Sequence, residues 1–181
     1  MGEGVVDRDP CNESRDELQY DNDFWRFSLK VYGQNGVADE CLALQESHGV
    51  DVNLLLFCAW IGTRAIVLNR GETEEASRLV AEWNHLIVRP LRSVRRNLKA
   101  SHAADISSFR ERVKAMEIEA EQIEQAILFA YAQRFRSTGA NTSCADAIAH
   151  NVNQYVTMTA DGPQPGLTAP ILVKASRLMS S

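Results

Sequence analysis

The chain has 181 residues, of which 45% are hydrophobic and 24% charged, and its formal net charge is −5 at pH 7. This is the composition of an ordinary globular protein, and the length favours one domain over two. β-Branched residues are scattered rather than alternating with polar residues, which argues against a sheet protein and predicts an all-α fold.

Acidic residues are concentrated at the N-terminus, where the first 24 residues contain eight acids against Arg8 and Arg15. This stretch has a charge of −6, so the remainder of the chain is at +1. A segment so charged, with few large apolar residues, cannot offset its ordering entropy. The expected organisation is a disordered acidic tail (1–20), a single helical bundle domain (21–158) and a C-terminal segment containing Pro and Gly (159–181).

Helical periodicity and capping residues place the elements in chain order. Gly33 and Gly49 are expected to end the first two helices. Thr73 can cap the fourth helix, and Pro90 is expected to kink or restart that fourth helix. The sequence therefore predicts a compact bundle of five to seven helices. They are expected over residues 21–32, 37–48, 51–68, 73–98, 105–135 and 143–157, with a half-helix in the final APILVKASRL.

The stretch GVDVNLLLFCAWIG, residues 49–62, is the most apolar part of the chain. Asp51 stands where a helix needs an N-cap. The apolar run is interrupted by Gly62, Thr63 and Arg64, and it is shorter than the ~20 residues that a membrane span requires. A helix that is apolar on all sides belongs at the centre of a globule. Residues 51–68 are therefore predicted to be the central helix of the bundle.

Residues 105–135 have the most regular apolar spacing, with steps of four and three that predict one long helix. The helix should form an antiparallel hairpin with the element before it. The apolar stripe consists of Phe109, Val113, Met116, Ala120, Ile123, Ile127 and Ala130.

Three segments resemble a family of small uncharacterised bacterial proteins, mostly proteobacterial, that is classed as a domain of unknown function. The resemblance covers about half of the chain. It implies a cytoplasmic, all-helical protein with no assigned activity, and it supplies no catalytic residue. The segments are FWRFSLKVYG at 24–33, ECLALQESHGVDVNLLLFCAWIG at 40–62 and WNHLIVRPLRSVRRNLK at 83–99.

Four polar residues are candidates for a ligand site: Asp51, Asn53, Glu82 and His85. Asp51 and Asn53 flank the start of the apolar helix and could face a cleft, although capping by Asp51 and a bridge from Asn53 to neighbouring backbone is the simpler interpretation, which we favour. Glu82 and His85 form one E-x-x-H, whereas di-iron bundles require two. The sequence therefore predicts no metal site.

Signals for catalysis are weak. Cys58 lies inside the apolar helix, where a thiolate would be poorly solvated. No G-x-S-x-G, Walker or G-x-G-x-x-G motif is present, so no catalytic residue and no cofactor is predicted, and enzyme status stays open. The cysteines show no disulfide framework and the N-terminus shows no secretory signal, which favours the cytoplasm.

A basic run is the strongest feature outside the predicted core: Arg89, Arg92, Arg95, Arg96 and Lys99. It could bind an acidic protein partner or a phosphate-containing ligand, and less favourably a nucleic acid. The simpler reading, which we favour, pairs it with carboxylates of the next helix. These are Glu117, Glu119, Glu121 and Glu124.

Two functional hypotheses follow. The first is a non-catalytic interaction or regulatory module that binds a protein partner or a small ligand, with the basic run as its contact. The alternative is an enzyme, or a metal or cofactor carrier, with a polar site inside the bundle near Asp51, Asn53, Glu82 and His85.

Overall fold

The computed structural model describes residues 18–100, 104–136, 142–159 and 168–179, so most of the predicted acidic tail lies outside the described residues. In these ranges all regular structure is helical, as predicted. Taking the uninterrupted run from α4 to α5 as one rod, the described ranges contain seven helical rods. The elements are α1 (Asp23–Tyr32), α2 (Val37–His48), α3 (Val52–Thr63), α4 (Arg70–Trp83), η1 (Asn84–Val88), α5 (Arg89–Asn97), η2 (Leu98–Ala100), α6 (Ala104–Ala132), α7 (Cys144–Thr159) and α8 (Pro170–Leu178).

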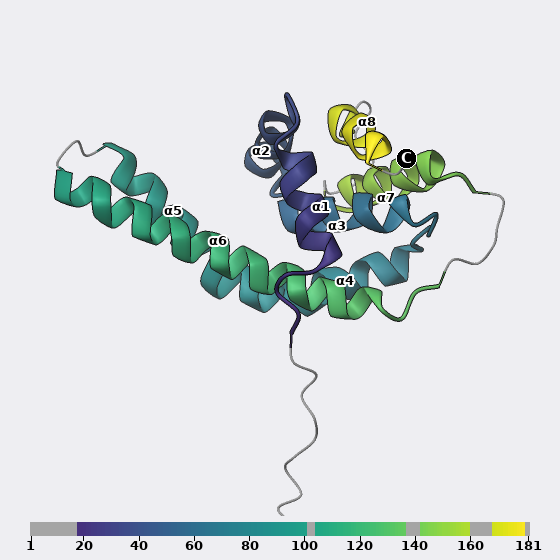
Figure 1. Cartoon of the computed structure of the whole chain (residues 1–181), viewed down its shortest axis with the longest axis horizontal. Coiled ribbons are helices and arrows are strands. Elements are labelled where there is room, and N and C mark those ends of the chain that lie inside the picture. Colours follow the sequence, from purple (N-terminus) through teal and green to yellow (C-terminus); the bar gives the residue numbers. More distant parts are fainter. Residues whose placement is uncertain (1–17, 101–103, 137–141, 160–167, 180–181) are drawn as a thin grey trace, which may run out of the picture.

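Helix α3 is the core helix. Every residue from Asn53 to Gly62 is buried, and Asp51 caps the helix by accepting a hydrogen bond from the Asn53 backbone N–H at 2.9 Å. Helices α1, α2, α6, α7 and α8 pack around it (Figure 1). No helix in the described part of the chain combines the length and the apolar character of a membrane span. The predicted burial of this helix is confirmed.

The end of α3 differs from the prediction, because the helix stops at Thr63 rather than at Leu68. Ala65 adopts a left-handed conformation with φ of 55°, which turns the chain out of the helix. The side chain of Asn151 in α7 then forms hydrogen bonds with backbone groups of this turn. Its amide donates to the Ile66 carbonyl at 2.9 Å and accepts from the Leu68 N–H at 2.9 Å. A buried partner distant in sequence therefore decides where the helix ends.

The predicted cap of the fourth helix is wrong. Asn69, not Thr73, caps α4: its side chain accepts from the Glu72 N–H, and the Glu72 carboxylate accepts from the Asn69 N–H. This reciprocal arrangement is a capping box, which satisfies two otherwise unpaired donors. Thr73 is instead buried in the first turn of the helix.

Pro90 does not break the helix that contains it. The chain continues through the π-helical turn η1 into α5, with the proline near the start of α5. Proline has no N–H to donate and its ring crowds the preceding turn. The wider π turn ends just before Arg89, whose backbone N–H donates to the Asn84 carbonyl. The disruption that was expected near Pro90 therefore takes the form of a π turn over residues 84–88 within an uninterrupted helical rod.

Helix α5 and the first half of α6 form an antiparallel hairpin, as predicted, and this hairpin projects from the body as an arm (Figure 1). The stripe of α6 is only partly inward. Val113 and Ala120 are buried, but Phe109 and Met116 are 45% and 56% exposed. The apolar stripe is therefore not the buried face of α6, because Ala130 in the second half is also exposed while Glu124, Leu128 and Tyr131 are buried.

Gly62 allows α3 and α7 to approach closely. A Cβ at this position would lie 2.5 Å from the backbone N and Cα of Ile148. Replacing Gly62 with alanine is expected to destabilise the protein by about 2–3 kcal/mol, because two packed backbones would have to separate. Urea unfolding measures this. Gly71→Ala is the control, since Gly71 is exposed in the first turn of α4. Equal stability of the two variants would contradict the close crossing.

Candidate functional site

Two adjoining clefts lie where the corner between α2 and α3 meets η1 and α5. Their volumes are about 440 Å³ and 610 Å³, within the usual range for small-molecule sites. The smaller extends along α2 and α5, and the larger extends toward α4 and α7. Both are lined by Gly49, Asp51, Asn84 and Arg89. These four residues therefore mark the centre of the candidate site.

The α2–α3 corner is rigidly held. Gly49 ends α2 in the left-handed conformation with φ of 66°, which glycine adopts without steric cost. The Asp51 N–H donates to the Tyr155 hydroxyl of α7 at 3.0 Å. With its carboxylate engaged as the cap of α3, Asp51 is fixed at the boundary of the two clefts.

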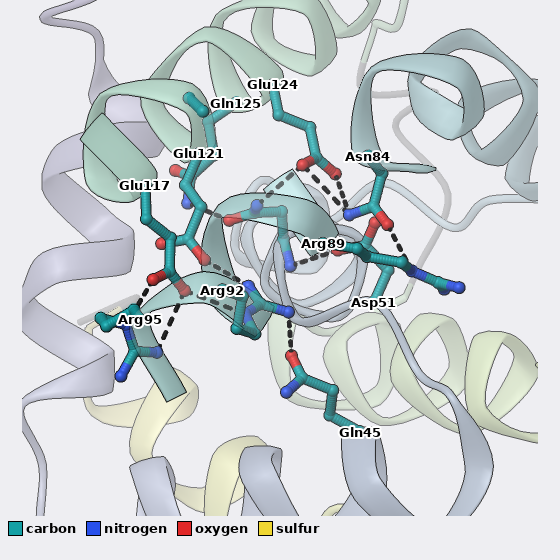
Figure 2. Close-up of polar contacts among 12 residues, drawn as sticks. Gln45, Asp51, Asn84, Arg89, Arg92, Arg95, Glu117, Glu121, Glu124 and Gln125 are labelled. Carbon is teal, nitrogen blue, oxygen red and sulfur yellow. Dashed lines mark hydrogen bonds and ion pairs between the residues drawn. The ribbon is translucent and has the colours of Figure 1, made fainter. Parts of the chain in front are cut away.

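The π turn η1 sets the position of Asn84, which is buried. A π turn inserts an extra residue into a helix and is frequent at functional sites. The Asn84 amide lies between two charged elements: its Nδ2 donates to a Glu124 carboxyl oxygen at 3.3 Å, and its Oδ1 accepts from Arg89 Nε at 2.8 Å (Figure 2). Asn84 thereby connects the interior of α6 to the cleft.

Glu124 is a fully buried carboxyl group. Asn53 Nδ2 donates to it at 3.2 Å, and Asn53 in turn accepts from Gln125 Nε2 at 2.8 Å. Burial, followed by the negative charge of Asp51 and a hydrogen bond to it, raises the pKa of Glu124 to about 10. The neutral form of the Glu124 carboxyl group is therefore favoured in the folded protein.

An ion-pair network joins α5 to α6. Arg92 Nε donates to Glu117 at 3.0 Å, its terminal nitrogens donate to Glu121 and to Gln45, and Arg95 also donates to Glu117 (Figure 2). Although burial opposes ionisation, the hydrogen bonds from Arg95 and Arg92 lower the pKa of Glu117. The expected pairing between helices is thus present for Glu117 and Glu121. The expected pairing of Glu124 with the basic run was wrong, because Glu124 accepts hydrogen bonds from the side-chain amides of Asn53 and Asn84.

The rest of the basic run is more exposed. Arg96 pairs with Glu46 at 2.9 Å on the surface, where such a pair contributes little. Lys99 is exposed and has no ion-pair partner among the described residues. Arg89 is different: Asn84 orients its Nε, while its two terminal nitrogens have no hydrogen-bond partner in the described part of the chain. Arg89 is therefore a positioned cation with unused donors.

Only two of the four residues predicted as a ligand site, Asp51 and His85, line the same cleft. Asp51 lines both clefts, and Asn53 is buried behind it. His85 is exposed and lines the larger cleft. Glu82 is exposed and lines neither cleft. Within the described ranges no three His, Cys, Asp or Glu side chains gather as metal ligands. Burial also raises the pKa of the Cys58 thiol.

Sequence reasoning missed the residues that link these elements: Asn84, Gln125, Gln45 and Tyr155. One available signal was the seven-residue spacing of Glu117 and Glu124, which puts both on the same side of α6 as the buried Val113 and Ala120. Carboxylates at that spacing beside an apolar stripe indicate buried acids. Asn84 had a similar signal, because it lies four residues after the buried Val80 and eight after the buried Ala76, on the same face of the helix.

The family model described as "Protein of unknown function (DUF2390)" matches residues 23–128. The chain belongs to the DUF2390 family. No curated protein and no solved structure matches it. The matched region runs from α1 through most of α6, so it contains Asp51, Asn84, Arg89 and Glu124. Tyr155, which holds the corner from α7, lies outside the DUF2390 match.

Proposed function

We propose that this DUF2390 protein binds a small anionic molecule, carrying a carboxylate or a phosphate, in the cleft beside Asp51. The observation that carries the proposal is the state of Arg89. Its Nε is fixed by Asn84, and its terminal nitrogens are unpaired among the described residues at the boundary of the two clefts. Guanidinium groups bind carboxylates and phosphates through paired hydrogen bonds, which suits this geometry.

The other charged residues of the clefts leave Arg89 as the cation with unused donors. Arg92 and Arg96 also line the smaller cleft, but they pair with Glu117, Glu121 and Glu46. Arg78 and Glu74 both line the larger cleft. Glu124 is protonated behind Asp51, which removes one negative charge from the region. The Asp51 carboxylate can still accept a hydrogen bond, so we expect the ligand to carry a hydroxyl or amine in addition to its anionic group.

Replacing Arg89 with alanine tests the proposal. A panel of inorganic phosphate, pyrophosphate and hydroxy-dicarboxylates is screened by thermal shift and measured by calorimetry. At least one member should bind the wild type, and Arg89→Ala should weaken it roughly tenfold to a hundredfold, because one charge-assisted contact is lost. Arg26→Ala is the control: Arg26 is on α1 and lines neither cleft. Equal affinity of the wild type and Arg89→Ala would refute the assignment.

An enzyme acting on the same ligand is a second candidate. The observation that favours it is the fully buried Glu124 carboxyl group behind the cleft, because a carboxyl group whose pKa is raised by burial can act in acid–base catalysis. Asp51 lines both clefts, so it would be the carboxylate that contacts the ligand. Following the binding panel by NMR separates turnover from simple binding.

Binding of an acidic protein or of nucleic acid to the α5 cations is less favoured. Arg92 and Arg95 are neutralised by Glu117 and Glu121, which leaves few free charges for such a partner. We place the protein in the cytoplasm as part of the proposal. The free thiols of Cys41 and Cys58 support a reducing compartment.

A further inference from the structure

The arm formed by α5 and the first half of α6 has two unlike sides. One side carries the ion pairs of Arg92 and Arg95 and contacts α2 through Gln45. Large apolar side chains elsewhere on the arm remain open: Val94 of α5 is 44% exposed, and Phe109, Met116 and Ile118 of α6 are 45%, 56% and 43% exposed. Phe109 and Met116 are seven residues apart and share one face of α6, and exposed apolar residues on one face of a projecting helix are typical of an interaction surface.

We propose that this apolar side of the arm is a homodimer interface, in which α6 packs antiparallel against α6 of a second copy. The inference is independent of the proposed function, because the arm surface and the cleft use different residues. The basis of the proposal is that the residues on this face of α6 would meet complementary residues on the same face of a second, antiparallel α6.

The complementarity follows from the spacing along α6. Phe109, Met116 and Ile123 are seven residues apart and therefore share one face. A two-fold axis near Met116 places Phe109 of one copy opposite Ile123 of the other. Because the interface is isologous, each such contact occurs twice.

The charges beside this face have the same symmetry. Arg112 and Glu119 lie on one edge of it, seven residues apart and on opposite sides of Met116. Neither has an ion-pair partner among the described residues; Arg112 lies over the Phe109 ring at 5.5 Å. In the antiparallel dimer Arg112 of each copy meets Glu119 of the other, giving two ion pairs. Any partner helix would need an acidic residue opposite Arg112 and a basic residue opposite Glu119. A second α6 in the antiparallel direction supplies both.

Sedimentation velocity of the full chain over a wide concentration range tests the proposal. The wild type should dimerise. Arg112→Glu and Glu119→Arg should each weaken the dimer roughly tenfold, because both ion pairs become repulsive, and the double variant should recover it. Met116→Glu should give a monomer with an unchanged circular dichroism spectrum.

Ile118→Glu is the matched control. Ile118 is also exposed, at 43%, but lies on the opposite face of α6 about 200° from Met116. The dimer should tolerate it. A monomeric wild type at every concentration would overturn the proposal, as would a dimer that Met116→Glu leaves intact or that Ile118→Glu dissociates equally. Failure of the double variant to recover the dimer would overturn the antiparallel register.

Discussion

Replacing Asn151 with leucine is expected to destabilise the protein by about 2–6 kcal/mol, because the Ile66 carbonyl and the Leu68 N–H lose their buried partner at about 1–3 kcal/mol each. Asn151 is fully buried, and its amide bonds to the carbonyls of Cys58 and Ile66 and to the N–H of Leu68. The Cys58 carbonyl lies within α3 and keeps its helical partner. Leucine has the same number of side-chain heavy atoms but offers neither a donor nor an acceptor, so the hydrogen bonds are lost.

Urea unfolding measures the loss, and hydrogen exchange locates it. In the Asn151→Leu variant the Leu68 amide should exchange faster relative to amides in the middle of α6. Asn153→Leu is the matched control, because Asn153 is exposed on the same helix and should change stability little. An Asn151→Leu protein as stable as this control would show that the turn after α3 does not depend on Asn151.

Replacing Glu124 with glutamine is expected to stabilise the protein by roughly 2–4 kcal/mol near pH 7. Burial, together with the charge of Asp51, raises the pKa of Glu124 to about 10, far above the value of about 4.3 in an unfolded chain. The folded state therefore binds one more proton than the unfolded state at neutral pH. Glutamine can keep both the donor and the acceptor roles without that proton.

The sign of the pH dependence follows from the direction of this shift. Because the folded pKa is raised, the contribution of Glu124 is fully present below about pH 4 and is lost as pH rises toward about 10. Wild-type stability should fall between about pH 5 and pH 9 by up to ~1.4 kcal/mol per unit relative to Glu124→Gln. Urea unfolding at several pH values measures the difference.

Glu82→Gln makes the same chemical change at an exposed position of α4 and should leave the pH profile unchanged. If Glu124→Gln is less stable than the wild type, or if its profile runs parallel to that of the wild type, then Glu124 is ionised in the folded protein. In that case the account of a neutral, buried Glu124 fails, while the anion contact of Arg89 is unaffected.

The candidate site was only partly visible in the sequence. Asp51 was recognisable because capping residues obey local rules, and the pairing of Arg92 with Glu117 followed from an antiparallel hairpin with charges on both helices. The roles of Asn84 and Glu124 were not recognisable. An asparagine in an ordinary helix and a glutamate among four others give no local sign that they meet in the interior.

What the sequence determined by itself is the helical architecture, because periodicity, caps and the apolar run at residues 51–63 act through near neighbours in the chain. What only the tertiary structure decided is where elements end and which polar groups are buried. Asn151 of α7 bonds to the turn that follows α3, Glu124 of α6 meets Asn53 and Asn84 in the interior, and the arm leaves Met116 uncovered. Each of these depends on contacts between residues far apart in sequence, whose free energy no local pattern reports.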